Sequence, residues 1–307
     1  MLRKSLKVLV VALFFFTTFA NAEKAELRRH TVMADGHPIA LWEKSAAGAT
    51  ESVLLVHGRT WSALPDFDIQ VTGENLSMMD SFVDEGYAVY AVDLRGYGET
   101  PRDKTEWLTP NRATDDVAQV VTWISAQSDW AFKPHLFGWS MGSTISQLMV
   151  QRHPQLVESL ILFGYWRDVE GVIPADAAGI EPEHATNTAA AAASDFITPG
   201  SISAAAVDAY VAAALAADPV RVDVRSMDQY NTLDGAKISI PTLVIAGEFD
   251  PLAPASNQVK LLTSLATGHK QFVSVPNSDH AALLERPRDY FLHEIAAFLV
   301  GVTMQRG

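Results

Sequence analysis

The sequence predicts an α/β protein whose mainly parallel sheet is covered by helices on both faces. Short apolar runs typical of strands alternate with helical stretches along most of the chain. Several of these runs stop at a glycine, as at His57-Gly58 and Gly138. The 307 residues are 48% hydrophobic and 19% charged, a composition typical of globular proteins with a core. This length allows one large domain or two ordinary ones.

Eight segments have the character of strands. The expected strands, in chain order, are residues 30–33, 39–43, 53–56, 87–92, 135–137, 160–163, 242–246 and 271–275. The first two flank the turn signal Asp35-Gly36, so we expect a hairpin there. The third is continuously apolar, as in a strand that is buried on both faces.

Helical stretches lie between these strands. The expected helices are residues 76–85, 112–126, 145–152 and 288–299. Gly86 ends the first of them and Pro154 ends the third. Apolar residues recur with helical spacing in the second, namely Val117, Val120, Val121 and Ile124. The last is amphipathic and closes the chain.

Residues 166–236 interrupt this alternation. They are rich in alanine, which favours helix, and they contain no apolar run of the buried-strand type. Apolar residues are available for packing, among them Ile197, Tyr210, Val211 and Leu215. We therefore expect a helical cap over the sheet, inserted after the sixth strand, with a core formed by residues 23–165 and 237–307. A flexible tether is the alternative.

The amino terminus has the pattern of a secretory signal peptide. Arg3, Lys4 and Lys7 precede an apolar run over residues 8–16, and Ala20-Asn21-Ala22 matches a cleavage site. We expect residues 1–22 to be removed after Ala22, which leaves a periplasmic or secreted protein without a stable membrane anchor. An uncleaved anchor is the alternative, although the run is short for a span of about 20 residues.

Charge and cysteine content exclude several classes of protein. The net charge of −13 argues against a nucleic-acid partner, because such proteins need a basic face. The absence of cysteine excludes disulfides, thiolate metal sites and a cysteine nucleophile. Histidines and carboxylates with the spacing of metal ligands are also missing from the sequence, so we expect neither a metal nor a cofactor.

A candidate nucleophile lies in Gly138-Trp139-Ser140-Met141-Gly142, which matches the G-x-S-x-G elbow. A serine on a strained strand-to-helix turn projects its hydroxyl away from the sheet, and the flanking glycines allow close approach of backbone and helix. The expected strand before the motif and helix after it suit this interpretation. A plain glycine-rich turn is the alternative.

A serine hydroxyl needs a base, and the base needs an acid that orients it. His280 follows the last expected strand directly, and Asp250 follows the strand before it. The order Ser140, Asp250, His280 is the one expected for a fold with this elbow. Asp168 follows the strand over residues 160–163 and is the main alternative to Asp250.

Other polar residues in these loops are less suitably placed to act as the acid or the base. Asp279 is next to His280 and would point elsewhere, and Glu248 lies two residues too early. His57 precedes Gly58 at a strand end, where we expect it to support the loop by hydrogen bonds.

Acyl transfer also requires donors for the oxyanion of the tetrahedral intermediate. We expect the backbone N–H of Met141, at the start of its helix, to be one donor, and the N–H of Arg59 to be the second. One such donor is typically worth about 3 kcal/mol of barrier.

The chain resembles the α/β-hydrolase superfamily. The residues that carry this resemblance are His57-Gly58, Asp93-Leu94-Arg95-Gly96-Tyr97-Gly98, the elbow around Ser140, Asp250 and His280. The resemblance implies an eight-stranded, mostly parallel sheet, a Ser-His-Asp acyl-enzyme mechanism and a variable cap. Serine at the elbow argues against dehalogenases and epoxide hydrolases of this fold, which carry aspartate there. Residues 57–68 are also similar to resistance esterases that open macrolide lactones.

Aromatic and acidic residues indicate what the pocket holds. We expect Trp61, Trp139, Tyr165 and Trp166 to form an aromatic wall for a bulky apolar group, although Trp139 and Trp166 also suit the sheet–cap interface. Four acidic residues make the early cap negative, namely Glu170, Asp176, Glu181 and Glu183. They form a solvated face or bind a cationic group such as an amino sugar.

These observations predict an exported serine hydrolase, a monomer or small homo-oligomer, that acts on a small-molecule ester or lactone. An amidase, peptidase or perhydrolase on the same fold is the first alternative. The second is of another class, a ligand-binding receptor that keeps the triad without turnover.

Overall fold

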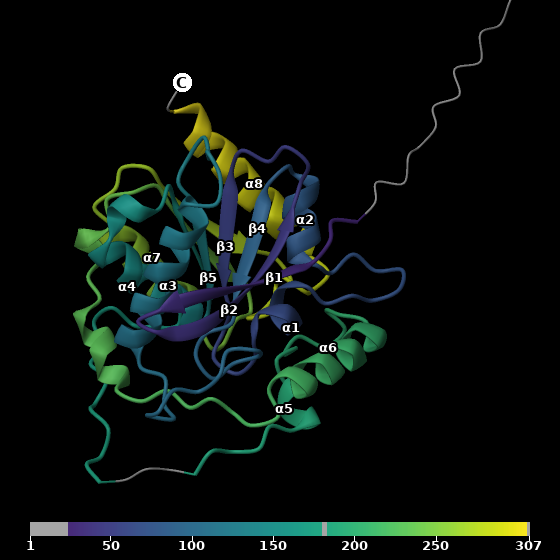
Figure 1. Ribbon diagram of the computed structural model, residues 1–307, viewed down its shortest axis with the longest axis vertical. Coiled ribbons are helices and arrows are strands. Elements are labelled where there is room, and N and C mark those ends of the chain that lie inside the picture. The colour runs from purple at the N-terminus through teal and green to yellow at the C-terminus, as the bar shows by residue number, and fades with distance from the viewer. Residues whose placement is uncertain (1–23, 180–182, 306–307) are drawn as a thin grey trace, which may run out of the picture.

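The computed structural model of the protein describes residues 24–179 and 183–305 (Figure 1). Its centre is one eight-stranded sheet with the order β1-β2-β4-β3-β5-β6-β7-β8. The strands are β1 (Arg28–Ala34), β2 (His37–Ser45), β3 (Ser52–Val56), β4 (Ala88–Val92), β5 (His135–Trp139), β6 (Leu160–Phe163), β7 (Thr242–Gly247) and β8 (Lys270–Val275). β2 runs antiparallel to β1 and β4, and the pairs from β4 to β8 are parallel. The predicted mostly parallel, eight-stranded sheet is confirmed.

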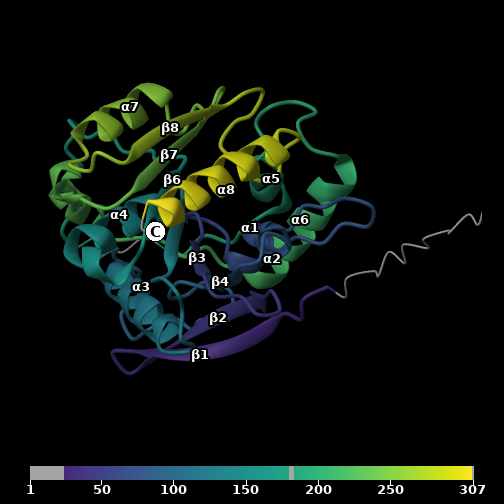
Figure 2. The same cartoon turned by 90° about the horizontal axis from the view of Figure 1, so that it is seen from above.

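Helices cover both faces of this sheet. They are α1 (Ala63–Phe67), α2 (Met78–Asp84), α3 (Pro110–Ser125), α4 (Met141–Arg152), α5 (Ala189–Ala193), α6 (Ala204–Ala217), α7 (Ala255–Ser264) and α8 (Arg288–Met304), with three short 3-10 helices over Pro154–Leu156, Met227–Thr232 and Gly235–Lys237. In Figure 2, α3, α4 and α7 lie on one side of the sheet, and α1, α2 and α8 lie on the other.

Successive side chains of the central strands point to opposite faces of the sheet, so each face has its own hydrophobic core. In β3, Leu54 and Val56 pack with α3 and α4, whereas Val53 and Leu55 pack with α2 and α8. The residues of β3, β4, β5, β6 and β7 are all buried. The carboxyl ends of these parallel strands meet at one edge of the sheet, where ligand sites of open α/β sheets lie.

Polar residues begin several of the helices. The Ser77 hydroxyl accepts a hydrogen bond from the Asp80 N–H at the start of α2, and Thr109 accepts from the Arg112 N–H before α3. Pro110 then stands in the first turn of α3, where no N–H is needed. Such caps satisfy backbone donors that the helix itself leaves free.

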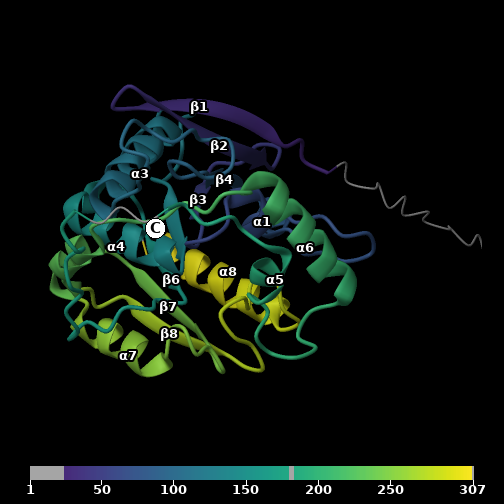
Figure 3. The same ribbon diagram turned by 90° about the horizontal axis from the view of Figure 1, so that it is seen from below.

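The cap segment, residues 166–236, contains α5 and α6, which lie beyond the carboxyl ends of the strands (Figure 3). In α6 the buried residues are Ala206, Tyr210 and Ala214, four positions apart, so a single stripe of the helix packs inward. The helical character expected for the whole insertion is limited to α5, α6, the 3-10 helix over Met227–Thr232 and the start of the one over Gly235–Lys237. The described residues between 166 and 188 contain neither helix nor strand.

The structure adds two helices that the sequence did not predict, α1 and α7. In α7 only Gln258 and Leu261 are buried, so the sequence carries little helical periodicity there. The predicted signal peptide, residues 1–22, lies outside the described residues. Across residues 24–179 and 183–305, every helix is too short or too polar to span a membrane.

Candidate active site

Ser140 lies on a sharp turn between β5 and α4. Its backbone has φ 53° and ψ −117°, a conformation that is costly for a residue with a Cβ. The Ser140 N–H donates to the carbonyl of Phe163 at the end of β6, at 2.9 Å. The neighbouring strand therefore holds the turn in its strained form.

The glycines of the elbow are required by close backbone contacts. A Cβ on Gly138 would lie 2.3 Å from the carbonyl oxygen of Gly142. A Cβ on Gly142 would lie 2.2 Å from the carbonyl oxygen of Val56, at the end of β3. Both distances are well below a van der Waals contact, so α4 can approach the strand ends only if these positions lack a side chain.

The structure brings Ser140, His280 and Asp250 together. His280 Nε2 lies 2.8 Å from Ser140 Oγ, and His280 Nδ1 lies 2.7 Å from Asp250 Oδ2. The other carboxylate oxygen of Asp250 accepts from the N–H groups of Leu252 and Ala253, at 2.8 and 2.9 Å. His280 and Asp250 are buried. The hydroxyl can pass its proton to Nε2, because Nδ1–H is held by the carboxylate.

Two further residues fix His280 in this position, and neither was predicted to do so. Trp139 Nε1–H donates to the main-chain oxygen of His280 at 2.7 Å. Gly164, after β6, has φ +61°, and a Cβ there would lie 2.9 Å from His280 Cε1. The imidazole thus packs directly on the Gly164 backbone. The sequence did not predict this contact, because a single glycine after a strand is common and does not indicate which side chain packs on it.

The alternative acids lie elsewhere. Asp168 is half-exposed and pairs with Lys260 at 3.2 Å. The backbone N–H of Glu170 and then Lys260 lower the pKa of Asp168. Glu248 accepts from the N–H of Asn277 at 2.9 Å. Neither therefore takes the place of Asp250 beside the imidazole.

Asp279 joins the histidine loop to the cap. Its side chain is fully buried, with Oδ2 accepting a short hydrogen bond from the Thr198 N–H and Oδ1 accepting from the Ala281 N–H at 3.1 Å. Close by, the Arg286 N–H donates to the Ser201 carbonyl at 2.7 Å. The cap segment around residues 195–201 is therefore tied to the loop that carries His280.

The loop after β3 lies against Ser140. A Cβ built on Gly58 would be 3.7 Å from Ser140 Cβ. His57 supports the loop as expected: Nδ1 lies 2.8 Å from the Gly58 carbonyl, and Nε2 accepts from the Leu94 N–H at 3.1 Å. Since Nε2 accepts, the ring proton is on Nδ1. Burial lowers the pKa of His57 to about 4, so this imidazole is neutral near pH 7.

The two predicted oxyanion donors belong to the helix that follows Ser140 and to the loop after β3. Met141 is the first residue of α4, and Arg59 follows Gly58 in the loop after β3. The Tyr97 hydroxyl donates a short hydrogen bond to the Arg59 carbonyl, which fixes this peptide. The role of both N–H groups stays a prediction.

Most of the predicted aromatic wall is buried. Trp61, Trp139 and Tyr165 are 2%, 4% and 0% exposed, and only Trp166 is partly exposed, beside Tyr230. The first three therefore have packing roles, which for Trp139 was the alternative drawn from the sequence. Their contact with a substrate stays a prediction.

The acidic residues of the early cap form surface ion pairs. Glu170 lies 2.6 Å from Lys260, and Asp176 lies 2.9 Å from Arg225. Glu183 is exposed, and Glu181 lies outside the described residues. These contacts suit a solvated face.

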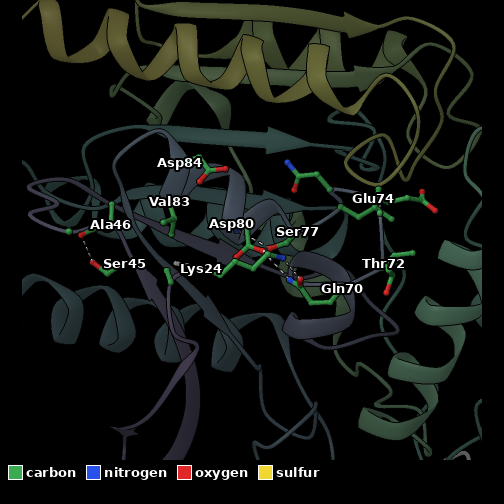
Figure 4. A pocket seen from close by; sticks show the side chains of 16 residues that line it. Lys24, Ser45, Ala46, Gln70, Thr72, Glu74, Ser77, Asp80, Val83 and Asp84 are labelled. Atoms are coloured by element: carbon green, nitrogen blue, oxygen red, sulfur yellow. Dashed lines mark hydrogen bonds and ion pairs between the residues drawn. The ribbon is translucent and has the colours of Figure 1, made fainter. Parts of the chain in front are cut away.

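A surface groove of about 1070 Å³ lies beside α2, away from the triad (Figure 4). Lys24 at its rim donates to Gln70 at 2.9 Å and lies 3.4 Å from Asp80. Asp80 is also paired with Lys44 at 2.6 Å. The groove contributes no side chain to the triad. In the part of the chain that the structure describes, no group of three or more His, Asp or Glu side chains is arranged to hold a metal ion.

The fold and the elbow together define an α/β hydrolase with a serine at the nucleophile position. The chain belongs to the hydrolase family described as serine aminopeptidase, S33, which it matches over residues 49–287. It is 31% identical over 122 residues to the pimeloyl-[acyl-carrier protein] methyl ester esterase of Neisseria meningitidis. That match covers 39% of this chain, and the chain spans 38% of the length of that relative.

Solved structures share the architecture. A thermophilic esterase from Thermogutta terrifontis superposes with a TM-score of 0.62 at 20% identity, covering 90% of this chain and 99% of that one. The serine hydrolase CarC, involved in carbazole degradation, gives a TM-score of 0.62 at 19% identity, with 90% and 99% covered. At these identities the likeness establishes the fold.

Proposed function

We propose that the protein is an exported serine hydrolase that cleaves carboxylic esters through an acyl-enzyme. The observation that carries this proposal is the unbroken series of hydrogen bonds from Asp250 through His280 to Ser140. Each member lies at a hydrogen-bond distance from the next, which is the geometry that general-base activation of a serine needs.

In the first half of the reaction, Ser140 Oγ attacks the ester carbonyl carbon while its proton moves to His280 Nε2. The imidazolium is stabilised by Asp250, which stays ionised. The N–H groups of Met141 and Arg59 stabilise the oxyanion. His280 then gives the proton to the departing alcohol oxygen, and the C–O bond breaks to leave an acyl ester on Ser140.

In the second half, water replaces the alcohol. His280 Nε2 takes a proton from the water as its oxygen attacks the acyl carbon, and the same proton returns to Ser140 Oγ when the acid leaves. A lactone would be opened by these steps rather than split, because its acid and alcohol belong to one molecule.

The names of relatives favour esters as the substrate class. The Neisseria relative is an esterase of a methyl ester, and the Thermogutta structure is an esterase. The family description names an aminopeptidase, so amides and peptides are the second candidate class. A macrolide lactone is a narrower proposal, which rests on the resemblance of residues 57–68.

The test compares wild-type protein with Ser140→Ala on p-nitrophenyl esters, anilides, peptides and macrolides, followed by mass spectrometry. We expect a burst of p-nitrophenol and fluorophosphonate labelling, both lost in Ser140→Ala. Ser128→Ala, at an exposed position, is the matched control. A gain of one water mass on a macrolide would support the lactone proposal. Cleavage of anilides or peptides alone would replace the ester proposal, and failure of every substrate and of labelling would favour a binding protein.

Export is tested separately. We propose removal of residues 1–22, so the amino-terminal sequence of protein recovered outside the cytoplasm is expected to begin at Glu23. Recovery of full-length protein in the membrane fraction would favour the anchor instead.

A further inference from the structure

An aspartate outside the triad lies directly behind the loop that flanks Ser140. Asp66, in α1, is 1% exposed. Its Oδ2 accepts from the Gly58 N–H at 3.3 Å. Its Oδ1 lies 3.1 Å from the hydroxyl of Tyr210, which comes from α6 in the cap. One carboxyl group therefore connects the oxyanion loop with the cap.

Tyr210 continues this connection to a second carboxyl group. The hydroxyl of Tyr210 also lies 3.1 Å from Oδ2 of Asp195, in the cap. The same Asp195 oxygen accepts from Trp61 Nε1–H at 2.7 Å. Trp61 belongs to the loop after β3, so the cap also contacts this loop directly. The Ser62 N–H of the same loop donates to Asp218 of the cap at 2.8 Å.

The Tyr210 hydroxyl has fewer hydrogens than it has carboxyl partners. A phenol has one hydrogen, so Tyr210 can donate to Asp66 or to Asp195 but not to both. The remaining contact is a hydrogen bond only if a carboxyl group supplies the hydrogen. Asp195 already accepts from Trp61, whereas the peptide N–H of Gly58 is the one donor to Asp66 besides Tyr210 among the described residues.

The surroundings agree that Asp66 carries the proton. The charged groups that act on it are Asp195 from the cap and Asp218 from the end of α6, and both are acidic. Burial, followed by these two carboxyl groups, raises the pKa of Asp66 well above its ordinary value. The hydrogen bonds from Gly58 and Tyr210 oppose the rise for Asp66. Burial also raises the pKa of Asp195, and there the hydrogen bonds from Trp61 and Tyr210 and the interaction with His280 oppose the rise.

We infer that Asp66 is a positioning residue of the oxyanion loop and acts as a neutral carboxylic acid. Its Oδ1–H donates to Tyr210, Tyr210 donates to Asp195, and Oδ2 holds the Gly58 N–H. The inference rests on the proposed function in that it assigns the loop after β3 to the oxyanion. Loss of the Asp66 proton leaves two carboxylates competing for one phenolic hydrogen, so one of the two Tyr210 contacts is lost at alkaline pH and the oxyanion loop is held less firmly.

Three variants test the arrangement. In Asp66→Asn, the amide oxygen can accept from Gly58 and the amide N–H can donate to Tyr210, so the neutral pattern is kept. Asp66→Ala removes both contacts, and we expect kcat on an ester to fall about 10- to 100-fold with KM changed less, because loss or misplacement of an oxyanion donor acts on the transition state. The kcat of Asp66→Asn should be close to that of the wild type. The kcat of Tyr210→Phe should lie between those of Asp66→Asn and Asp66→Ala.

The pH profile separates this role from a merely structural one. The neutral form of Asp66 is fully populated in the folded protein only below its raised pKa and is lost as pH rises through that pKa, and the stability it contributes declines from the unfolded pKa upward. We expect kcat of the wild-type protein to decline at alkaline pH and the decline to be absent in Asp66→Asn. Asp208→Asn, at an exposed position of α6, should behave like the wild type. An alkaline decline that is identical in wild type and Asp66→Asn would overturn the inference.

A spectroscopic measurement keeps the inference independent of turnover. The infrared difference spectrum of wild-type protein minus Asp66→Asn at neutral pH should contain the C=O stretch of a protonated carboxylic acid. Other buried acids cancel in the difference. Absence of that band overturns the inference even if Ser140 hydrolyses esters. If the band is present but the protein shows no Ser140-dependent hydrolysis, the neutral state of Asp66 is supported and the proposed function is contradicted.

Discussion

Trp139 and His280 are joined by a hydrogen bond of 2.7 Å from the indole N–H to the main-chain oxygen of the histidine. The residue that precedes Ser140 therefore supports His280, the base in the proposed mechanism. The two rings also lie 5.9 Å apart between centroids. Because Trp139 is the last residue of β5, the sheet itself aligns the histidine loop with the serine turn.

Trp139→Phe should lower kcat about 10-fold and the free energy of unfolding by about 1 to 2 kcal/mol. The reason is that the buried His280 oxygen loses its donor while the aromatic packing is largely kept. Ester kinetics and chemical denaturation measure both effects. Trp130→Phe is a matched control, since Trp130 makes the same kind of bond to the Ile124 carbonyl, also at 2.7 Å, away from the triad. Equal kinetic losses in the two variants would contradict the role given to Trp139.

Gly164→Ala should reduce kcat about 100-fold while the protein still folds. The new methyl group would lie 2.9 Å from His280 Cε1 and 3.1 Å from Nδ1, and displacement of a reacting group by about 1 Å can cost this much. Gly48→Ala has nearly the same φ, +73°, but nothing lies within 4 Å of the added Cβ, so it separates backbone strain from the clash. Equal kcat in both variants would show that the imidazole does not depend on this contact.

Asp250→Asn should lower kcat by about 10⁴-fold, because an amide at this position no longer favours the tautomer with the proton on Nδ1. Asp168→Asn should leave kcat almost unchanged, since that side chain pairs with Lys260 at the surface. Steady-state kinetics on one ester suffice. A large loss of kcat in Asp168→Asn together with near-normal kcat in Asp250→Asn would indicate that Asp168 is the acid.

The central strands and the nucleophile turn could be predicted because each follows from local rules. Continuous apolar runs in the sequence predicted β3, β4 and β7. The elbow could be recognised because close backbone contacts require glycine at positions 138 and 142. The order of Ser140, Asp250 and His280 then followed from strand order. By contrast, α7 is a solvent-facing helix with few buried residues and leaves almost no periodic signal.

The connection behind the oxyanion loop could not be predicted from the sequence. Asp66, Asp195 and Tyr210 come from three separate segments, and an isolated aspartate in a chain usually indicates a solvated position. Only the tertiary fold buries Asp66 and places it against Gly58. The packing of Gly164 on His280 is non-local in the same way.

His57 should make the protein less stable at acidic pH. Its folded pKa of about 4 is below the ordinary 6.5, so the unfolded chain binds the proton first as pH falls from 6.5 to 4. Stability present above pH 6.5 is lost in this window, by up to about 3 kcal/mol at its lower end. Denaturant unfolding of wild type and His57→Gln at several pH values measures the difference. Burial raises the pKa of Asp93 to about 6, an opposite effect that is common to both proteins. Parallel stability curves would contradict the prediction.

The short stretch of cap around residues 195–201 touches both the loop after β3, through Asp195 and Trp61, and the histidine loop, through Thr198 and Asp279. Replacing the whole cap to change substrate selectivity is therefore expected to change the turnover rate as well. A chimaera that carries the cap of another hydrolase would lose anchor points for two catalytic loops at once. Engineering of substrate range is better confined to α6 residues that face away from Tyr210.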